Sequence, residues 1–207
     1  MKKWIVLITA FIFLSSLTVE HKTKWISLFD GKSLEGWKVG NNANTFSIED
    51  GTIAVNGNVA HLFYDGSVQD HSFKNFEFSA DVKTLPGSNS GIYFHTEFQQ
   101  SSWPQKGYEA QVNNSHTDWR RTGSLYAIED VRETYAKDNE WYTEYIKVEG
   151  KNILIKINGK TVVDYTEPSN IKRPEGMKER VLSKGTFALQ GHDPKSKVYF
   201  KNIKVRV

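Results

Sequence analysis

From Trp25 onward, short segments of alternating apolar and polar residues are interrupted by Gly, Asn, Asp and Pro. No stretch of about 12 residues carries the apolar repeat of about 3.6 residues that marks an amphipathic helix. Because successive side chains of a strand point to opposite faces, this pattern predicts an all-β chain. The expected strands are 46–49, 52–55, 73–84, 91–97, 108–113, 143–149, 152–157, 160–165, 185–191 and 197–205.

Two hairpins are indicated by the residues at their turns. Residues 149–152, with the sequence EGKN, separate two apolar segments, and Asn158-Gly159 separates the second of these from a third. An Asn-Gly pair supplies the positive φ angles of a tight type I′ turn. The two turns would join the three segments into an antiparallel meander. Together with the long strands expected at 73–84 and 197–205, this meander predicts a two-sheet antiparallel β-sandwich rather than a small barrel.

Two connections, 114–141 and 166–184, are longer and more polar than a hairpin turn requires. Long loops on a β scaffold often carry function. Simple insertion at the surface is the alternative, and the composition of the two segments does not decide between these interpretations.

The composition bounds the function classes. With 207 residues, of which 38% are hydrophobic and 13% aromatic, the chain can form one domain with a hydrophobic core. The absence of cysteine excludes disulfides, thiolate zinc sites, iron–sulfur clusters, a cysteine nucleophile and a lipoprotein anchor. The 27 basic and 24 acidic residues are interleaved without a basic run, which argues against a nucleic-acid partner.

The first 20 residues resemble a secretory signal peptide. Lys2 and Lys3 precede an uncharged, mostly apolar stretch at 4–17, which is shorter than the about 20 residues of a membrane-spanning helix. We therefore expect a signal peptide at 1–20 and a single domain at 21–207, in a periplasmic or secreted protein that does not contact the membrane after cleavage. An uncleaved anchor is the alternative, because no clean A-x-A cleavage site lies near 15–19.

Polar residues of matching parity mark three of the expected strands. Glu109, Gln111 and Asn113 share one face of their strand, as do Gln190 and His192 of a second and Tyr93, His95 and Glu97 of a third. A solvated sheet face also alternates polar with apolar residues. Gln, His and Tyr, however, are better suited to binding hydroxyl groups than the Lys, Thr, Ser and Glu typical of such faces.

Several enzyme classes lack their motifs. The chain contains no HExxH, Walker loop, G-x-S-x-G or GxGxxG after a strand. Only Glu97 and Glu109 are plausible strand-borne carboxylates that face a ligand, so an orthodox two-carboxylate glycosidase is disfavoured. Four further histidines are expected at the surface or in local hydrogen bonds: His21, His61, His71 and His116.

A series of short motifs runs in order along the chain: FDGKSLEGW at 29–37, NFEF at 75–78, NSGI at 89–92, GYEAQ at 107–111, TGSLY at 122–126, NGK at 158–160, LQGH at 189–192 and FKNI at 200–203. In this order the chain after residue 20 resembles the 3-keto-disaccharide hydrolase domain family. Each motif is weak by itself, and the series is specific.

The resemblance implies a concanavalin A-like or laminin-G-like jelly roll that acts on glycosides whose C3 hydroxyl has been oxidised to a ketone. The ketone acidifies the C2 hydrogen, so one base can form an enolate that expels the C1 substituent before water adds. This chemistry needs a base, stabilisation of the enolate oxygen and a proton donor. A divalent metal could act as the Lewis acid, and a sugar 3-oxidoreductase would have to supply the substrate.

Five residues match the family's motifs: Glu109, Gln111, Tyr126, Gln190 and His192. From the chemistry, we expect Glu109 or His192 to be the base, Gln111 and Gln190 to bind sugar hydroxyls, and Tyr126 to donate a proton.

A further candidate is His95, which stands where many relatives have Arg and is expected to bind substrate. If a metal binds, imidazole from His95 or His192 with carboxylate from Glu109 or Glu97 would provide the ligands. Two other functions remain open. One is a non-catalytic carbohydrate-binding module that stacks sugars on Trp103 and Trp119, and the other is a structural cell-surface domain.

Overall fold

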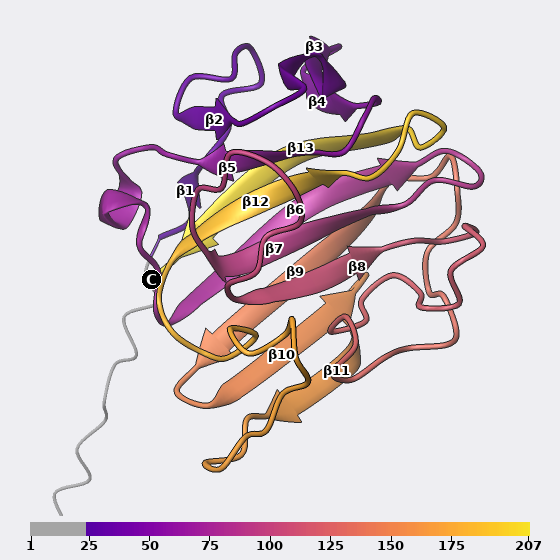
Figure 1. Ribbon diagram of the computed structural model, residues 1–207. Coiled ribbons are helices and arrows are strands. Elements are labelled where there is room, and N and C mark those ends of the chain that lie inside the picture. Colours follow the sequence, from indigo (N-terminus) through magenta and orange to yellow (C-terminus); the bar gives the residue numbers. More distant parts are fainter. Residues whose placement is uncertain (1–23) are drawn as a thin grey trace, which may run out of the picture.

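The computed structural model describes residues 24–207, so the expected signal peptide lies outside the described residues. Two antiparallel sheets stack face to face (Figure 1). The larger sheet has the order β11 (Lys160–Thr166), β10 (Asn152–Ile157), β9 (Tyr142–Glu149), β6 (Phe76–Thr84), β13 (Val198–Arg206), β4 (Thr52–Val55) and β3 (Phe46–Glu49), and β1 (Ile26–Ser27) pairs with β13. The smaller sheet has the order β2 (Trp37–Val39), β5 (Ala60–Tyr64), β12 (Thr186–Gly191), β7 (Ser90–Thr96) and β8 (Tyr108–Val112).

The predicted two-sheet antiparallel sandwich is therefore confirmed. The only helical pieces in the described part of the chain are two short 3₁₀ turns, Ala43–Thr45 and Val68–His71. No helix within residues 24–207 is long and apolar enough to cross a membrane.

The alternation pattern located most strands but missed β1, β2 and β5. Residues of β5 are buried on both faces, because loops cover the outer face of the smaller sheet. A strand buried on both sides reads as a continuous apolar run and shows no alternation. The predicted hairpin at Asn158-Gly159 is confirmed, because both residues have positive φ, 50° and 81°, and Ile157 pairs with Lys160.

The core lies between the sheets. Ile146 and Ile155 of the larger sheet are fully buried, and the rings of Phe78 and Phe187 meet across the two sheets with centroids 4.7 Å apart. Each such side chain contributes about 1.5–3 kcal/mol by leaving water. This packing fixes the position of β7, β8 and β12, which carry the polar residues discussed below.

Glu144 is an exception in the core. It occupies an inward position of β9, its side chain is fully buried, and neither carboxyl oxygen has a hydrogen-bond partner among residues 24–207. Burial raises the pKa of Glu144 well above 4.5. The folded state therefore favours the protonated form, and the protein loses stability as pH rises from the ordinary pKa toward the raised one.

Glu144→Leu should accordingly raise the free energy of unfolding at neutral pH by about 1–3 kcal/mol, the cost of a buried unsatisfied polar group. The gain should grow as pH rises above the ordinary pKa of a carboxyl group, and urea unfolding at several pH values measures it. Glu149→Gln, at an exposed position of the same strand, is the control. A pH-independent difference for Glu144→Leu would contradict the prediction.

Candidate active site on the five-stranded sheet

The polar rows predicted from alternation meet on the outer face of the smaller sheet. Tyr93 of β7 lies opposite Glu109 of β8, and Gly91 lies opposite Gln111. From β12, the Gln190 amide reaches the same place and donates to the Glu109 carboxylate at 2.8 Å. Three strands that are separated in sequence thus present their polar side chains together.

A cavity of about 220 Å³ lies over this face. Five predicted site residues line it: Glu109, Gln111, Tyr126, Gln190 and His192. The remaining lining residues are Asn89, Tyr93, Trp103, Asp118 and Arg180. Ligand pockets typically have about 300–1,000 Å³, so this cavity matches a small ligand.

Glu109 is at the base of the cavity and is only 3% exposed. Its Oε2 lies 3.9 Å from Nη2 of Arg180, and its Oε1 accepts the bond from Gln190. Burial raises the pKa of Glu109, while the charge of Arg180 and the hydrogen bond from Gln190 act against this rise. A carboxylate in such surroundings is more basic than one in water and still has a counter-charge.

Gly91 makes room for this carboxylate. A Cβ atom at position 91 would lie 2.5 Å from Oε1 of Glu109 and 3.0 Å from its Cγ. The Glu109 side chain therefore lies across the neighbouring strand, in the space that any other residue at position 91 would fill.

Gly91→Ala should lower the free energy of unfolding by about 1–3 kcal/mol, as expected for overpacking. The loss should largely vanish in the Glu109→Ala background, because the truncated side chain no longer meets the new methyl group. Urea unfolding of the four proteins forms the double-mutant cycle. An equal loss in both backgrounds would show that the glycine is needed for another reason.

The two glutamines retain hydrogen-bonding capacity. Gln111 donates from Nε2 to Oδ1 of Asn89 at 2.7 Å. The Oε1 atoms of Gln111 and Gln190 and the Nη1 atom of Arg180 are buried without a hydrogen-bond partner in the described part of the chain. Buried polar atoms are normally paired, so these groups are suited to a polar ligand.

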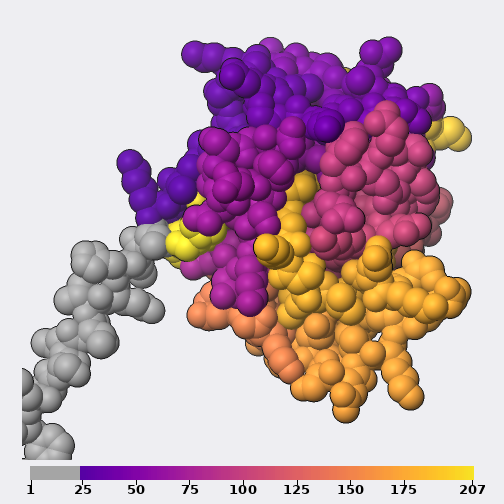
Figure 2. All heavy atoms as spheres, turned by 60° about the vertical axis from the view of Figure 1, so that its left-hand side comes forward, coloured from indigo at the N-terminus to yellow at the C-terminus, as the bar shows by residue number. Residues whose placement is uncertain are grey.

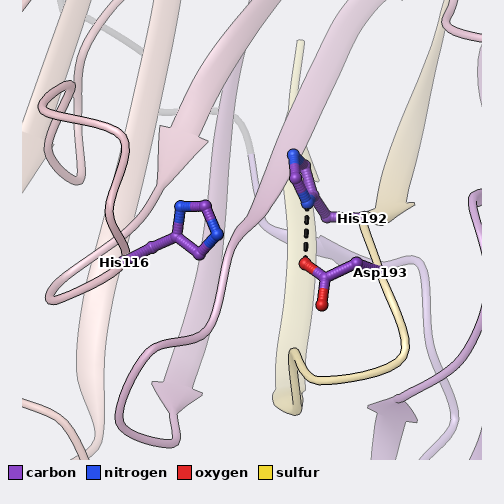
Figure 3. A group of neighbouring side chains, drawn as sticks. All are labelled: His116, His192 and Asp193. Atoms are coloured by element: carbon purple, nitrogen blue, oxygen red, sulfur yellow. Dashed lines mark hydrogen bonds and ion pairs between the residues drawn. The ribbon is translucent and has the colours of Figure 1, made fainter.

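His192 forms a pair with the next residue (Figure 3). Its Nδ1 lies 2.8 Å from Oδ2 of Asp193, which also accepts from Oγ of Ser196 at 2.7 Å. Burial raises the pKa of Asp193, but the hydrogen bonds from His192 and Ser196 outweigh it and lower the pKa to about 2. Asp193 is therefore ionised and holds Nδ1 of His192 as the donor, which leaves Nε2 available for proton transfer.

The ring of His116 faces His192 (Figure 3), with the ring centroids 5.5 Å apart. One ligand atom from each of His116, His192 and Asp193 lies within 4.8 Å of the others, so this group could hold a metal ion. The expected ligand set differed, since it included His95 and Glu109 with His192. His116, which we expected in a merely local role, is the imidazole that the fold brings to His192.

The structure does not bring His95 to the cavity. The register between β7 and β12 shifts by one residue, because Thr96 pairs with Thr186 while Tyr93 pairs with Ala188. At this bulge His95 has φ 56°, and its ring packs against Phe76 of the other sheet, 5.7 Å between centroids. A bulge ends the strict alternation of faces, so the expected substrate and metal roles of His95 are not supported by its position.

Loops supply the residues that alternation could not predict. Asp118 and Tyr126 come from the long connection between β8 and β9, and Arg180 comes from the connection between β11 and β12. Trp103, in the loop between β7 and β8, is 40% exposed and lies 5.4 Å from the His192 ring. Trp103 had a sequence signal, as an aromatic residue in a polar loop. Arg180 had none.

Comparison with known proteins finds a family model and a curated relative that match most of the chain. A family model described as 3-keto-alpha-glucoside-1,2-lyase-like domain matches residues 24–206. A 3-keto-disaccharide hydrolase of Bacteroides thetaiotaomicron is 29% identical over 169 residues, which cover 68% of this chain and 58% of that protein. The chain therefore spans little more than half the length of this curated relative.

Solved structures support the jelly-roll form of the sandwich. A candidate glycosyl hydrolase of Parabacteroides distasonis aligns with a TM-score of 0.75 and 24% identity over 88% of this chain and 93% of its own. The carbohydrate-binding module CBM66 of Bacillus subtilis aligns with a TM-score of 0.58 and 15% identity, over 83% and 96% of the two chains. At these identities the likeness concerns the fold.

Proposed function

The chain belongs to the 3-keto-alpha-glucoside-1,2-lyase-like domain family, and from this premise we propose that it cleaves the glycosidic bond of 3-keto-glycosides. The observation that carries the proposal is the buried Glu109 carboxylate, which shares a small polar cavity with Gln111, Gln190 and His192. The cavity suits one sugar ring, with the aglycone outside.

In the proposed reaction Glu109 removes the C2 proton, which the neighbouring ketone makes acidic. The enolate then expels the oxygen at C1, and Nε2 of His192 protonates that oxygen as it leaves. Water adds to C1 of the resulting enone, with the two residues acting in reverse, so the net reaction is hydrolysis.

Glu109 is assigned as the base for two reasons. Burial raises its pKa, which increases its proton affinity, while Arg180 supplies a counter-charge to its ionised form. His192 is assigned as the acid because ionised Asp193, 2.8 Å from Nδ1, would stabilise the imidazolium. Tyr126 lines the same cavity, and burial raises its pKa, so it stays protonated and able to donate.

If a divalent metal binds, His116, His192 and Asp193 would hold it, because their nitrogen and oxygen atoms are ligands that such ions accept. It would supply Lewis-acid stabilisation of an oxygen on the substrate. His192 would then no longer be available as the acid, and Tyr126 would be the proton donor that lines the cavity. A sugar 3-oxidoreductase is the class of enzyme that must supply the ketone. We place the protein outside the cytoplasm on the strength of the sequence at 1–20.

A second candidate function is a non-catalytic sugar-binding module. It is favoured by Trp103, whose exposed ring lies at the cavity and offers a face for a sugar to stack on.

The cavity's second carboxylate, Asp118, lies 3.5 Å from Nη1 of Arg120. Ordinary two-carboxylate hydrolysis would need Asp118 together with Glu109.

One experiment separates these functions. The purified protein is incubated with a 3-keto-glucoside and with its unoxidised parent, before and after EDTA treatment, and the products are followed by mass spectrometry. Cleavage of only the keto form is the expected result, and its dependence on EDTA reports on a metal. Cleavage of the parent would indicate an ordinary glycosidase, and binding without turnover would indicate a binding module.

A further inference from the structure

The connection between β11 and β12, residues 167–185, brings a guanidinium group to the cavity. Arg180 is only 9% exposed, lines the cavity and lies 5.4 Å from the centre of the Tyr126 ring. The gold atoms of this part of the chain lie at the molecular surface in Figure 2. The segment belongs to neither sheet, and its path is set by its own contacts.

Arg180 is only loosely paired. The 3.9 Å contact with Glu109 is longer than the about 2.7–2.9 Å of a strong charge-assisted hydrogen bond. Its Nη1 has no hydrogen-bond partner in residues 24–207. A buried cation is costly unless it is well paired. The under-paired guanidinium group of Arg180 is therefore suited to a negative charge that forms elsewhere in the cavity.

We propose that Arg180 stabilises the enolate oxygen of a bound 3-keto sugar, and that Arg173 positions it. This inference rests on the proposed function. When the C2–H bond breaks, the proton goes to Glu109, the electron pair forms the C2–C3 double bond, and the carbonyl pair moves to the C3 oxygen beside the guanidinium. When the C3 carbonyl re-forms, C1 and C2 become doubly bonded, and the C1–O bond breaks with its electrons on the leaving oxygen. No oxidant or reductant is consumed.

Arg173 links the backbone of Arg180 to the strand that carries Glu109. Its Nε donates to the carbonyl oxygen of Arg180 at 2.8 Å, and its Nη2 donates to the hydroxyl of Tyr108 at 2.8 Å. Tyr108 precedes Glu109 in β8. The base and the cation are therefore held relative to each other through one side chain.

Two further contacts pin the segment on either side of Arg180. The N–H of Gly107 donates to the carbonyl of Glu179 at 3.0 Å. The N–H of Ser183 donates to Nδ1 of His95 at 3.2 Å, and Nε2 of His95 lies 2.9 Å from the carbonyl oxygen of Lys74. His95, which does not reach the cavity, thus serves as an anchor for the segment that does.

The test measures proton exchange at C2 of a 3-keto-glucoside in D₂O, which reports enolate formation without bond cleavage. Arg180→Ala should slow the exchange by about 10²–10³-fold, the usual cost of one oxyanion donor. Guanidinium ion, added well below denaturing concentrations, should restore at least a tenth of the lost rate, and ammonium should not. Arg180→Lys, which keeps the charge without the planar guanidinium group, should also exchange slowly. It serves as a second variant in case the alanine variant misfolds.

The positioning role has its own readout. Arg173→Gln should lower kcat about tenfold with little change in KM, and should have no further effect in the Arg180→Ala background. Lys172→Gln is the matched control, because Lys172 is the exposed neighbour of Arg173 and its substitution removes the same charge. Equal effects of the two substitutions would overturn the positioning role.

The outcomes also separate this inference from the proposed function. If the unaltered protein neither exchanges the C2 proton of the 3-keto-glucoside nor cleaves it, both the proposed function and this inference are contradicted. If it does both, and the Arg180 variants exchange as fast or are not rescued by guanidinium, only the inference fails.

Discussion

Replacing Glu109 by glutamine should lower kcat for a 3-keto-glucoside by about 10²–10⁴-fold, the contribution of a general base. Glutamine has the shape of glutamate and can still accept the hydrogen bond from Gln190, so the cavity should keep its form. The amide, however, cannot take the C2 proton. Steady-state kinetics and C2 exchange in D₂O measure the effect, and both rates should fall together.

The matched control for this substitution is Glu97→Gln. Glu97 follows β7, is exposed and pairs with Lys106 at 2.8 Å, so the change removes the same charge away from the cavity. Its activity should stay near that of the unaltered protein. Undiminished C2 exchange in the Glu109→Gln protein would rule out Glu109 as the base and leave His192 as the candidate.

The pH dependence follows from the same carboxylate. The base must be ionised, so kcat/KM should fall as pH drops through the pKa of Glu109. Because burial raises that pKa, the fall should occur at a higher pH than for a carboxyl group in water. The charged or titratable groups that face Glu109 are Arg180, Tyr93, Tyr126 and His192, and the residual activity of Glu109→Gln should lack this acidic limb.

Replacing His192 by glutamine should also lower cleavage by about 10²–10⁴-fold, but it should leave C2 exchange measurable. The reason is that enolate formation needs the base, whereas departure of the C1 oxygen needs the acid. A nitrophenyl 3-keto-glucoside, whose leaving group needs little protonation, should be affected much less than an alkyl one. Comparing the two substrates isolates the step.

Two substitutions serve as controls for this second prediction. His71→Gln alters an exposed histidine outside the cavity and should have no effect. Asp193→Asn should give a smaller loss, because the amide oxygen can still accept from Nδ1 but no longer stabilises the imidazolium. If His192→Gln loses C2 exchange and cleavage equally, the assigned role of His192 is contradicted. If His116→Gln loses as much cleavage as His192→Gln, and the loss depends on added metal, the two histidines bind a metal ion.

Much of the fold and part of the candidate site followed from local sequence. The strands expected at 46–49, 52–55 and 152–157 are observed with the same bounds. The parity of Glu109 with Gln111 predicted their common face. These predictions succeed because a strand with one exposed face must alternate, so each residue's neighbours two positions away carry the information.

Other features could not be predicted because their cause lies in distant parts of the chain. β5 shows no alternation since both of its faces are covered. His95 turns away from Tyr93 at a bulge that exists only in the pairing of β7 with β12. The need for glycine at position 91 becomes visible only when the Glu109 side chain of the next strand is seen to occupy its space.

The sequence alone thus determined the β-sandwich, its Asn158-Gly159 hairpin and the polar rows, because these depend on contacts along one strand or one turn. Only the tertiary structure decided that His116 lies beside His192 and that Arg180 reaches Glu109. Both residues sit in irregular connections, where no periodicity relates a residue to the direction of its side chain. Their positions depend on how the loops pack onto the sheets, which the hydrogen bonds of Arg173 and His95 set for Arg180.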